Sequence, residues 1–225
     1  ALDALFRVPA RRFASQMFEF DRRIGADGLR SAAVWAARQF TGTVTATGVQ
    51  HIPATGPVII VSNHPGLSDT IDLFASIPRD DMRIVAGHRP FLVALTNLTR
   101  HLVFVQEDAG ARMGAFRSVI TELKAGRAVL TFPAGKIEPD PGVRRDDARA
   151  SLATWIESIG LLARLMPETR IVPVMVSGVF SHAAYRNPIA QRKTELAQRE
   201  RMDAMVLAMW PGYQRNTVRL NFGPA

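Results

Sequence analysis

The sequence predicts an α/β fold, with a largely parallel sheet flanked by helices and an amphipathic helical pair at its N-terminus. Short β-branched or apolar runs alternate with helical segments of roughly 10–20 residues, which is typical of strand–helix–strand units. The chain has 225 residues, of which 47% are apolar, enough to bury the core of one domain. It contains no cysteine, which excludes a disulfide scaffold, a thiolate metal site and a cysteine nucleophile.

The helical pair is predicted by the spacing of apolar residues in the first 41 positions. Over residues 2–24 these positions recur mostly at intervals of three or four, and we expect Pro9 to break the helix. A turn at Gly25–Gly28 is followed by a second helix over 29–40. We therefore expect residues 1–41 to form a helical N-terminal segment, and 42–225 to form the main domain.

The rest of the chain reads as alternating strands and helices. The predicted strands are 43–49, 57–62, 82–86, 102–105, 128–132, 171–176 and 218–222. The predicted helices are 70–77, 91–98, 110–125, 144–165 and 189–209. Pro173 interrupts the sixth strand, which indicates a sheet edge, a bulge or a strand start.

The charge balance limits the classes of partner. The chain carries 28 basic and 20 acidic residues, a net charge of +8, which suits nucleic acid, an anionic lipid surface or a phosphate-bearing substrate. No helix-turn-helix, zinc or RNA-recognition motif accompanies the charge, so we do not expect a nucleic-acid partner. No apolar run approaches the roughly 18 residues of a membrane-spanning helix, and the opening residues lack a signal peptide's apolar core.

The first candidate site lies where the second predicted strand meets a helix. His64 falls in the loop and Asp69 near the first helical turn, at the strand's carboxyl end, where α/β proteins bind ligands. The carboxylate would accept the Nδ1–H of His64, which leaves Nε2 free to take a proton from a hydroxyl. Spacing alone favours the alternative, in which His64 is a loop residue bonded to the main chain and Asp69 is a helix cap.

The second candidate site follows the fifth predicted strand. Thr131–Lys136 reads Thr-Phe-Pro-Ala-Gly-Lys, in which exposed turn amides and a lysine suit an anion. A plain strand-to-loop turn with Lys136 in solvent is the alternative.

Three segments in this order resemble the glycerolipid acyltransferase family, typified by lysophosphatidate acyltransferases. The family's Asn-His-x4-Asp, Phe-Pro-Glu-Gly and Val-Pro-Val motifs are matched by Asn63-His64-x4-Asp69, Phe132–Gly135 and Val172–Val174. The resemblance covers about residues 43–225. It implies an enzyme in which His64 deprotonates an acceptor hydroxyl that attacks the thioester of acyl-CoA or acyl-carrier protein, while Asp69 orients His64.

The resemblance also implies the substrates and the location. The acceptor would be a lysophospholipid or glycerolipid, no further cofactor or metal is expected, and the protein would be peripheral or monotopic on the cytoplasmic side of a membrane. The arginine-rich N-terminal helices would lie in the lipid interface, or pack on the domain core instead. Amides around Gly135 are candidate donors to the oxyanion. The expected substrate-binding residues are Asn63, Phe132, Pro133, Gly135, Lys136 and Arg112.

Two departures from the family pattern weaken the assignment of a lysophosphatidate acceptor. Ala134 replaces the glutamate of Phe-Pro-Glu-Gly, and Glu107 stands where a phosphate-binding arginine is expected after Phe104-Val105. Lys136 and Arg112 are the candidate replacements for that arginine. Alternatives therefore include a non-phosphate or amine-containing lipid acceptor and a catalytically silent lipid-binding relative. A serine lipid hydrolase lacks support because the chain has no Gly-x-Ser-x-Gly motif.

Overall fold

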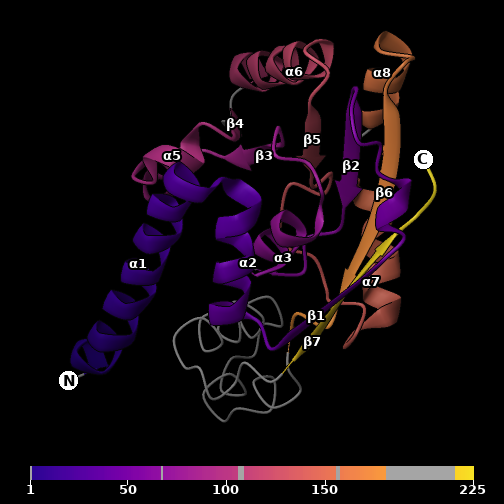
Figure 1. Ribbon diagram of the computed structural model, residues 1–225. Helices are drawn as coiled ribbons and strands as arrows, with labels where there is room; N and C mark the ends of the chain where they lie inside the picture. Colours follow the sequence, from indigo (N-terminus) through magenta and orange to yellow (C-terminus); the bar gives the residue numbers. More distant parts are fainter. Residues whose placement is uncertain (1, 67, 106–108, 156–157, 181–215) are drawn as a thin grey trace.

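The computed structural model describes residues 2–66, 68–105, 109–155, 158–180 and 216–225. It confirms the predicted α/β class: one seven-stranded sheet in the order β1-β7-β6-β2-β5-β3-β4, with helices on both faces (Figure 1). The strands are β1 (Thr43–Thr47), β2 (Val58–Ser62), β3 (Arg83–Gly87), β4 (Leu102–Val105), β5 (Ala128–Thr131), β6 (Arg170–Ser177) and β7 (Thr217–Phe222). The helices are α1 (Leu2–Asp27), α2 (Leu29–Phe40), α3 (Asp69–Ser76), α4 (Pro90–Val93), α5 (Thr96–Thr99), α6 (Ala109–Lys124), α7 (Arg145–Ser151) and α8 (Ser158–Leu165), with 3-10 turns at Val49–His51 and Leu152–Thr154.

The centre of the sheet is parallel, and one side of it is reversed. β2 pairs in parallel with both β5 and β6, with Val61 opposite Thr131 and Pro173. β7 pairs antiparallel to β6, and β1 runs parallel to β7. The carboxyl ends of β2, β5 and β6 therefore lie along the same edge of the sheet, where the predicted motifs begin.

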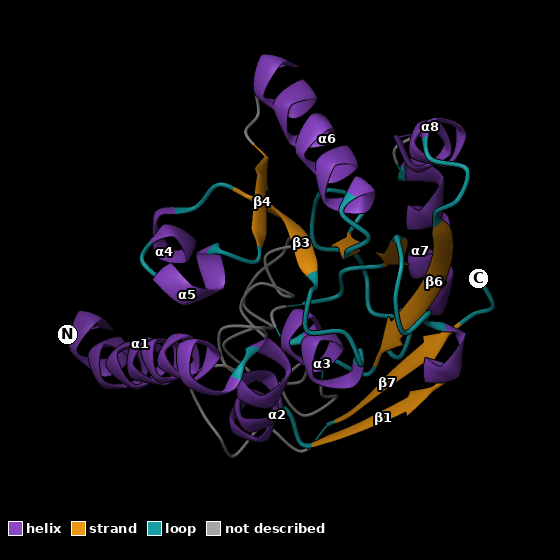
Figure 2. Ribbon diagram, turned by 45° about the horizontal axis from the view of Figure 1, so that its top comes forward, coloured by secondary structure: helices purple, strands orange, loops and turns teal. Residues whose placement is uncertain are grey.

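The two faces of β2 pack against different helices. Val58 and Ile60 belong to a cluster with α1, α2 and α3, whereas Ile59 and Val61 belong to a second cluster with α6 and α8. Figure 2 shows these two groups of helices on opposite sides of the sheet. β2 is buried along its full length because both faces are covered, as its continuous apolar run predicts.

The predicted break of the first helix at Pro9 is wrong. α1 is one helix of 26 residues that contains Pro9. The fixed φ of proline is itself helical, so the cost is mainly one main-chain hydrogen bond near the N-terminal end. The turn is also shorter than expected: the helix continues through Asp27, and Gly28, with φ +85°, makes the bend.

Two other predicted helices are each divided into shorter helices, at points where an acidic side chain from another segment accepts a hydrogen bond. In place of a helix over 91–98, α4 and α5 are separate, because Asp21 of α1 accepts the N–H groups of Asn97 (2.9 Å) and Leu98 (2.8 Å) where α5 begins. In place of a helix over 144–165, the chain forms α7, a 3-10 turn and α8. Trp155 is extended there, and its indole nitrogen donates to Glu138.

Pro173 lies in an interior strand, which corrects the expectation of a sheet edge. Its carbonyl accepts the N–H of Gly223 (2.8 Å), so its own nitrogen faces the end of β7, which stops at Phe222 opposite Val174. The missing donor therefore falls beyond the last residue of the β7 ladder.

No described helix combines the length and hydropathy required to cross a bilayer. The predicted helix over 189–209 lies outside the described residues. The division of the chain at residue 41 stays a prediction, although buried residues of α1 and α2 share a core cluster with the sheet.

Gly178→Ala should destabilise the fold by about 1–3 kcal/mol. Gly178 has φ +79°, and a Cβ there would lie 2.3 Å from the Thr217 carbonyl oxygen. Gly160→Ala is the matched control, because that position is helical with nothing near a new Cβ, and alanine should add about 0.5–1 kcal/mol. Urea unfolding of both variants checks this, and equal stability of the two would contradict it.

Candidate active site

His64 and Asp69 meet at the carboxyl end of β2. The Nδ1 atom of His64 lies 2.8 Å from Oδ2 of Asp69. β2 delivers the histidine to the loop, and α3 begins at Asp69 and turns its carboxylate back toward the imidazole. Because an ionised carboxylate carries no proton, Nδ1–H donates and Nε2 is left as the free, basic nitrogen. This is the arrangement predicted from the sequence.

The Asp69 carboxylate is fixed by three further donors. Oδ2 also accepts the Gly66 N–H (3.1 Å), and Oδ1 accepts the N–H (2.5 Å) and the hydroxyl (3.1 Å) of Thr70. Asp69 is completely buried in the first turn of α3, where the helix dipole also favours a negative charge. The acceptor of His64 is therefore held in one orientation, and with it the imidazole ring.

The His64 ring lies at the protein surface against Phe132. Its side chain is 23% exposed, and the two ring centroids are 4.3 Å apart and nearly parallel. Phe132 follows β5, the strand beside β2, so the parallel register brings the two predicted motifs together. A ring that is packed on one side and partly open is a suitable position for exchanging a proton with a bound molecule.

Two carboxylates act on the charge of His64. Burial alone would lower the pKa of its imidazole, but the charge and hydrogen bond of Asp69, together with the charge of Glu138, raise that pKa above its ordinary value. The imidazolium form is therefore stabilised, which is what a base requires once it has taken a proton.

The Asn63 side chain forms hydrogen bonds with the main chain of β6. Its side-chain nitrogen donates to the Val176 carbonyl (2.9 Å), and its oxygen accepts the Val176 N–H (2.7 Å). The residue is buried, so the expected contact with substrate is replaced by a link between the His64 loop and β6.

The turn after β5 is formed as expected, but its central amide is occupied. Gly135 has φ +63°, and its N–H donates to the Phe132 carbonyl (3.0 Å). That amide is therefore not available to an oxyanion, and of the amides expected around this turn only the others stay candidates. Pro133 is buried, whereas Gly135 and Lys136 are exposed at the same edge as His64.

Two other expected residues have no described contact that tests their role. Arg112 is exposed on α6 and, within the described part of the chain, forms no hydrogen bond or ion pair. Glu107 lies outside the described residues.

A nearby serine has no role as a nucleophile. Ser62 is fully buried, and its hydroxyl donates to the Asn63 carbonyl (2.7 Å). Across the residues that the structure describes, no cluster of three or more potential ligands is arranged to hold a metal ion.

Glu138 was not among the site residues expected from the sequence, yet it is fully buried and contacts His64. Its Oε2 accepts the His64 main-chain N–H (3.0 Å), and its Oε1 accepts the Ser151 hydroxyl and the Trp155 indole N–H (both 2.9 Å). The only available signal was an acidic residue closely following the Phe-Pro-Ala-Gly turn in a proline-rich stretch. That signal could not show which loop the carboxylate contacts.

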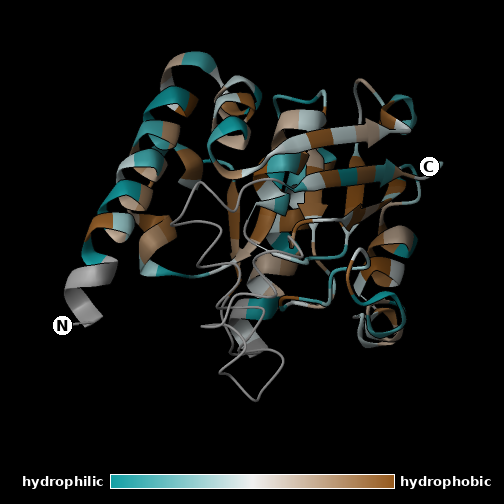
Figure 3. Ribbon diagram, turned by 90° about the horizontal axis from the view of Figure 1, so that it is seen from below, coloured by the Kyte–Doolittle hydropathy of each residue, from teal (hydrophilic) through white to brown (hydrophobic). Residues whose placement is uncertain are grey.

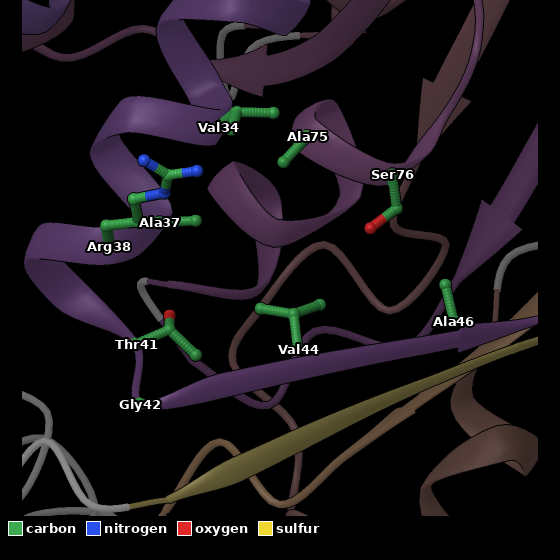
Figure 4. A pocket seen from close by; sticks show the side chains of 9 residues that line it. All are labelled: Val34, Ala37, Arg38, Thr41, Gly42, Val44, Ala46, Ala75 and Ser76. Carbon is green, nitrogen blue, oxygen red and sulfur yellow. The ribbon is translucent and has the colours of Figure 1, made fainter.

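A hollow of about 270 Å³ lies away from His64, between α2, α3 and β1 (Figure 4). Thr41, on its wall, donates its hydroxyl to both oxygens of Asp72 (2.9 and 3.0 Å). Asp72 is completely buried. Burial and, to a smaller extent, the Asp69 charge raise the pKa of Asp72 to about 8, against the Thr41 hydrogen bond.

The match to a family model agrees with the motifs. A family model described as "Acyltransferase" matches residues 43–177. A solved structure of the 1-acyl-sn-glycerophosphate acyltransferase PlsC from Thermotoga maritima is similar, with 17% identity over 94% of this chain and 67% of that chain and a TM-score of 0.45. A search of curated proteins finds no match.

Asp72→Asn should flatten the pH dependence of stability. The folded state holds the Asp72 proton to about pH 8, whereas an unfolded aspartate loses it near pH 4, so the contribution of Asp72 to stability declines as pH rises through that window. The variant should therefore gain on the parent, on the order of a few kcal/mol between pH 5 and 8. Urea titrations across this range test it, with exposed Asp80→Asn as control; parallel curves for Asp72→Asn and the parent would disprove it.

Proposed function

Because the chain belongs to the acyltransferase family, we propose that it moves a fatty acyl group from a thioester donor to a hydroxyl of a lysophospholipid or glycerolipid. The donor would be acyl-CoA or an acyl-carrier protein, and no further cofactor takes part. The hydrogen bond from His64 Nδ1 to buried Asp69, with the imidazole partly open, carries the proposal.

In the proposed reaction His64 acts as a general base. Its Nε2 takes the proton of the acceptor hydroxyl as that oxygen attacks the thioester carbonyl. The tetrahedral intermediate collapses with cleavage of the C–S bond, and the thiolate takes the proton from the imidazolium, so an ester and a free thiol result. A thiolate leaves readily, so orientation and a base suffice without an acyl-enzyme.

The loop after β5 bears on the acceptor head group. Ala134 leaves the Phe-Pro-Ala-Gly turn without the family's carboxylate, and Lys136 is an exposed cation beside it. A phosphate or another anionic group near Lys136 fits this chemistry. The acceptor panel below includes amine-containing and phosphate-free lipids, because either would also present a nucleophile to His64.

We also propose that the protein docks on a lipid surface through α1 and the chain around α4. Exposed apolar side chains at Val8 (74%), Phe18 (57%) and Phe91 (44%) lie among exposed arginines of the same elements. Figure 3 shows hydrophilic and hydrophobic residues alternating along α1, and Phe13 stacks on Phe91, which joins the two elements. Apolar side chains would enter the interface while arginines bind lipid phosphates, giving a peripheral or monotopic association.

His64→Ala should reduce acyl transfer by about 10²–10⁴-fold, because the base is removed. The assay is thiol release from long-chain acyl-CoA with a panel of lysolipid, amine-containing and phosphate-free acceptors. His88→Ala is the control, since His88 is an exposed histidine that follows β3. A His64→Ala variant as active as the parent would rule out the mechanism, and thioester binding without turnover on any acceptor would favour a silent relative.

Replacing Val8 and Phe18 together by serine should weaken binding to phosphatidylglycerol vesicles, because both exposed side chains would lose their apolar contact with lipid. Cosedimentation measures the effect, and binding by the parent should also decrease with salt. Met113 and Leu161, exposed apolar residues on α6 and α8, are changed to serine in the control variant. Equal binding by parent and both variants would contradict docking through α1.

A further inference from the structure

Glu138 joins the loops that follow two adjacent strands. Its main-chain N–H donates to the His64 carbonyl (2.8 Å), and its carboxylate accepts the His64 main-chain N–H (3.0 Å). His64 is thus bound at both of its main-chain polar groups by one residue. The conformation at the start of the β2 loop therefore depends on Glu138.

The carboxylate of Glu138 is also held by two side chains from the segment that contains α7 and the 3-10 turn. Ser151, at the end of α7, and Trp155, after the 3-10 turn, both donate to Oε1. Ser151 also donates to the Ala148 carbonyl, so its hydroxyl is anchored in α7. Glu138 is completely buried, and its contact to His64 is set by packing and not by solvent.

A buried carboxylate is costly to retain for main-chain anchoring alone. Ionised groups lose hydration on burial, and the Glu138 carboxylate is bound by three donors, the His64 main-chain N–H, the Ser151 hydroxyl and the Trp155 indole N–H. The charge reaches His64, whose imidazolium is favoured by Asp69 from α3 and by Glu138 from the loop after β5. Phe132, which stacks on the imidazole ring, is uncharged. Lys136, the nearest cation in the sequence of this loop, is exposed.

We propose that Glu138 is a positioning residue for His64, which holds the main chain of the base and supplies a second negative charge beside its imidazole. The carboxylate comes four residues after Ala134, in the loop where the family motif has its own glutamate. The inference rests on the proposed function for its catalytic consequence, whereas the charge coupling of the two residues is independent of any substrate.

Two variants separate the two effects of Glu138, and two others serve as controls. Glu138→Gln removes the charge and turns one acceptor into a donor, whereas Glu138→Asp keeps the charge but is too short to reach all its donors together. Asp140→Asn is the matched control: Asp140 is another buried acid of the same loop, and it binds the main-chain N–H groups of Gly142, Gly178 and Phe180. Asp69→Asn is the positive control for a change at the imidazole.

The pKa of His64 is measured by NMR titration of the histidine Cε1–H signals, with His64 assigned by its loss in His64→Ala. The chain has five histidines, so the spectrum is tractable. We expect Glu138→Gln and Asp69→Asn to lower this pKa, and Glu138→Asp and Asp140→Asn to leave it near that of the parent. The rising limb of kcat/KM against pH should move to lower pH in Glu138→Gln, and both Glu138 variants should lose about 10- to 100-fold in kcat/KM at the plateau.

Three results would overturn the inference. An unchanged His64 pKa in Glu138→Gln, or an equal shift in Asp140→Asn, would remove the charge coupling; full kcat/KM in Glu138→Asp would remove the positioning role. If Glu138→Gln does not fold, Glu138→Asp and Ser151→Ala still test positioning, because Ser151→Ala deletes one donor to Oε1 and should lower kcat/KM without moving the pKa. The titration needs no substrate, so a shift without turnover would disprove the proposed function and not the coupling.

Discussion

The site depends on the hydrogen bond between the His64 imidazole and the Asp69 carboxylate. A carboxylate can be buried there because it begins a helix and accepts three further hydrogen bonds. Among the described residues, its hydrogen-bond partners are the imidazole, two main-chain N–H groups and a hydroxyl, and none is a Lys or Arg side chain. The remaining structure holds the two residues in register: β2 and β5 lie side by side, Asn63 fastens the loop to β6, and Glu138 fastens it to the loop after β5.

Asp69 and Asp72 show how strongly local donors decide the state of a buried acid. Both lie in α3 and both are completely buried. Asp69 accepts main-chain N–H groups at the start of the helix, whereas Asp72, one turn later, receives a single hydroxyl from Thr41. Burial and the nearby Asp69 charge then raise the pKa of Asp72 to about 8, so a neutral acid joins α2 to α3 at neutral pH.

The N-terminal helices contribute to the same core that supports the site. Buried residues of α1 and α2 pack with α3 and one face of the sheet, and Asp21 of α1 starts α5 by accepting two of its N–H groups. The outer side of α1 carries exposed apolar and basic residues. The helices that carry the proposed lipid-docking surface therefore share a core cluster with α3, the helix that begins at Asp69.

Local sequence determined the class of the fold and all seven described strands, because hydrophobic period needs only neighbouring residues. The His64–Asp69 pair was predicted by the three ordered motifs of the family resemblance, since its spacing alone left other interpretations open. Local sequence could not determine features created by contacts between distant segments. Glu138 gains its role only when the loops after β2 and β5 meet, and the Gly135 amide is occupied by the turn's own geometry. Likewise, α5 begins where Asp21 supplies an acceptor, and Pro173 is tolerated inside the sheet because β7 ends beside it. In each case the partner of a polar group is far along the chain or set by exact main-chain geometry, and only the tertiary structure fixes it.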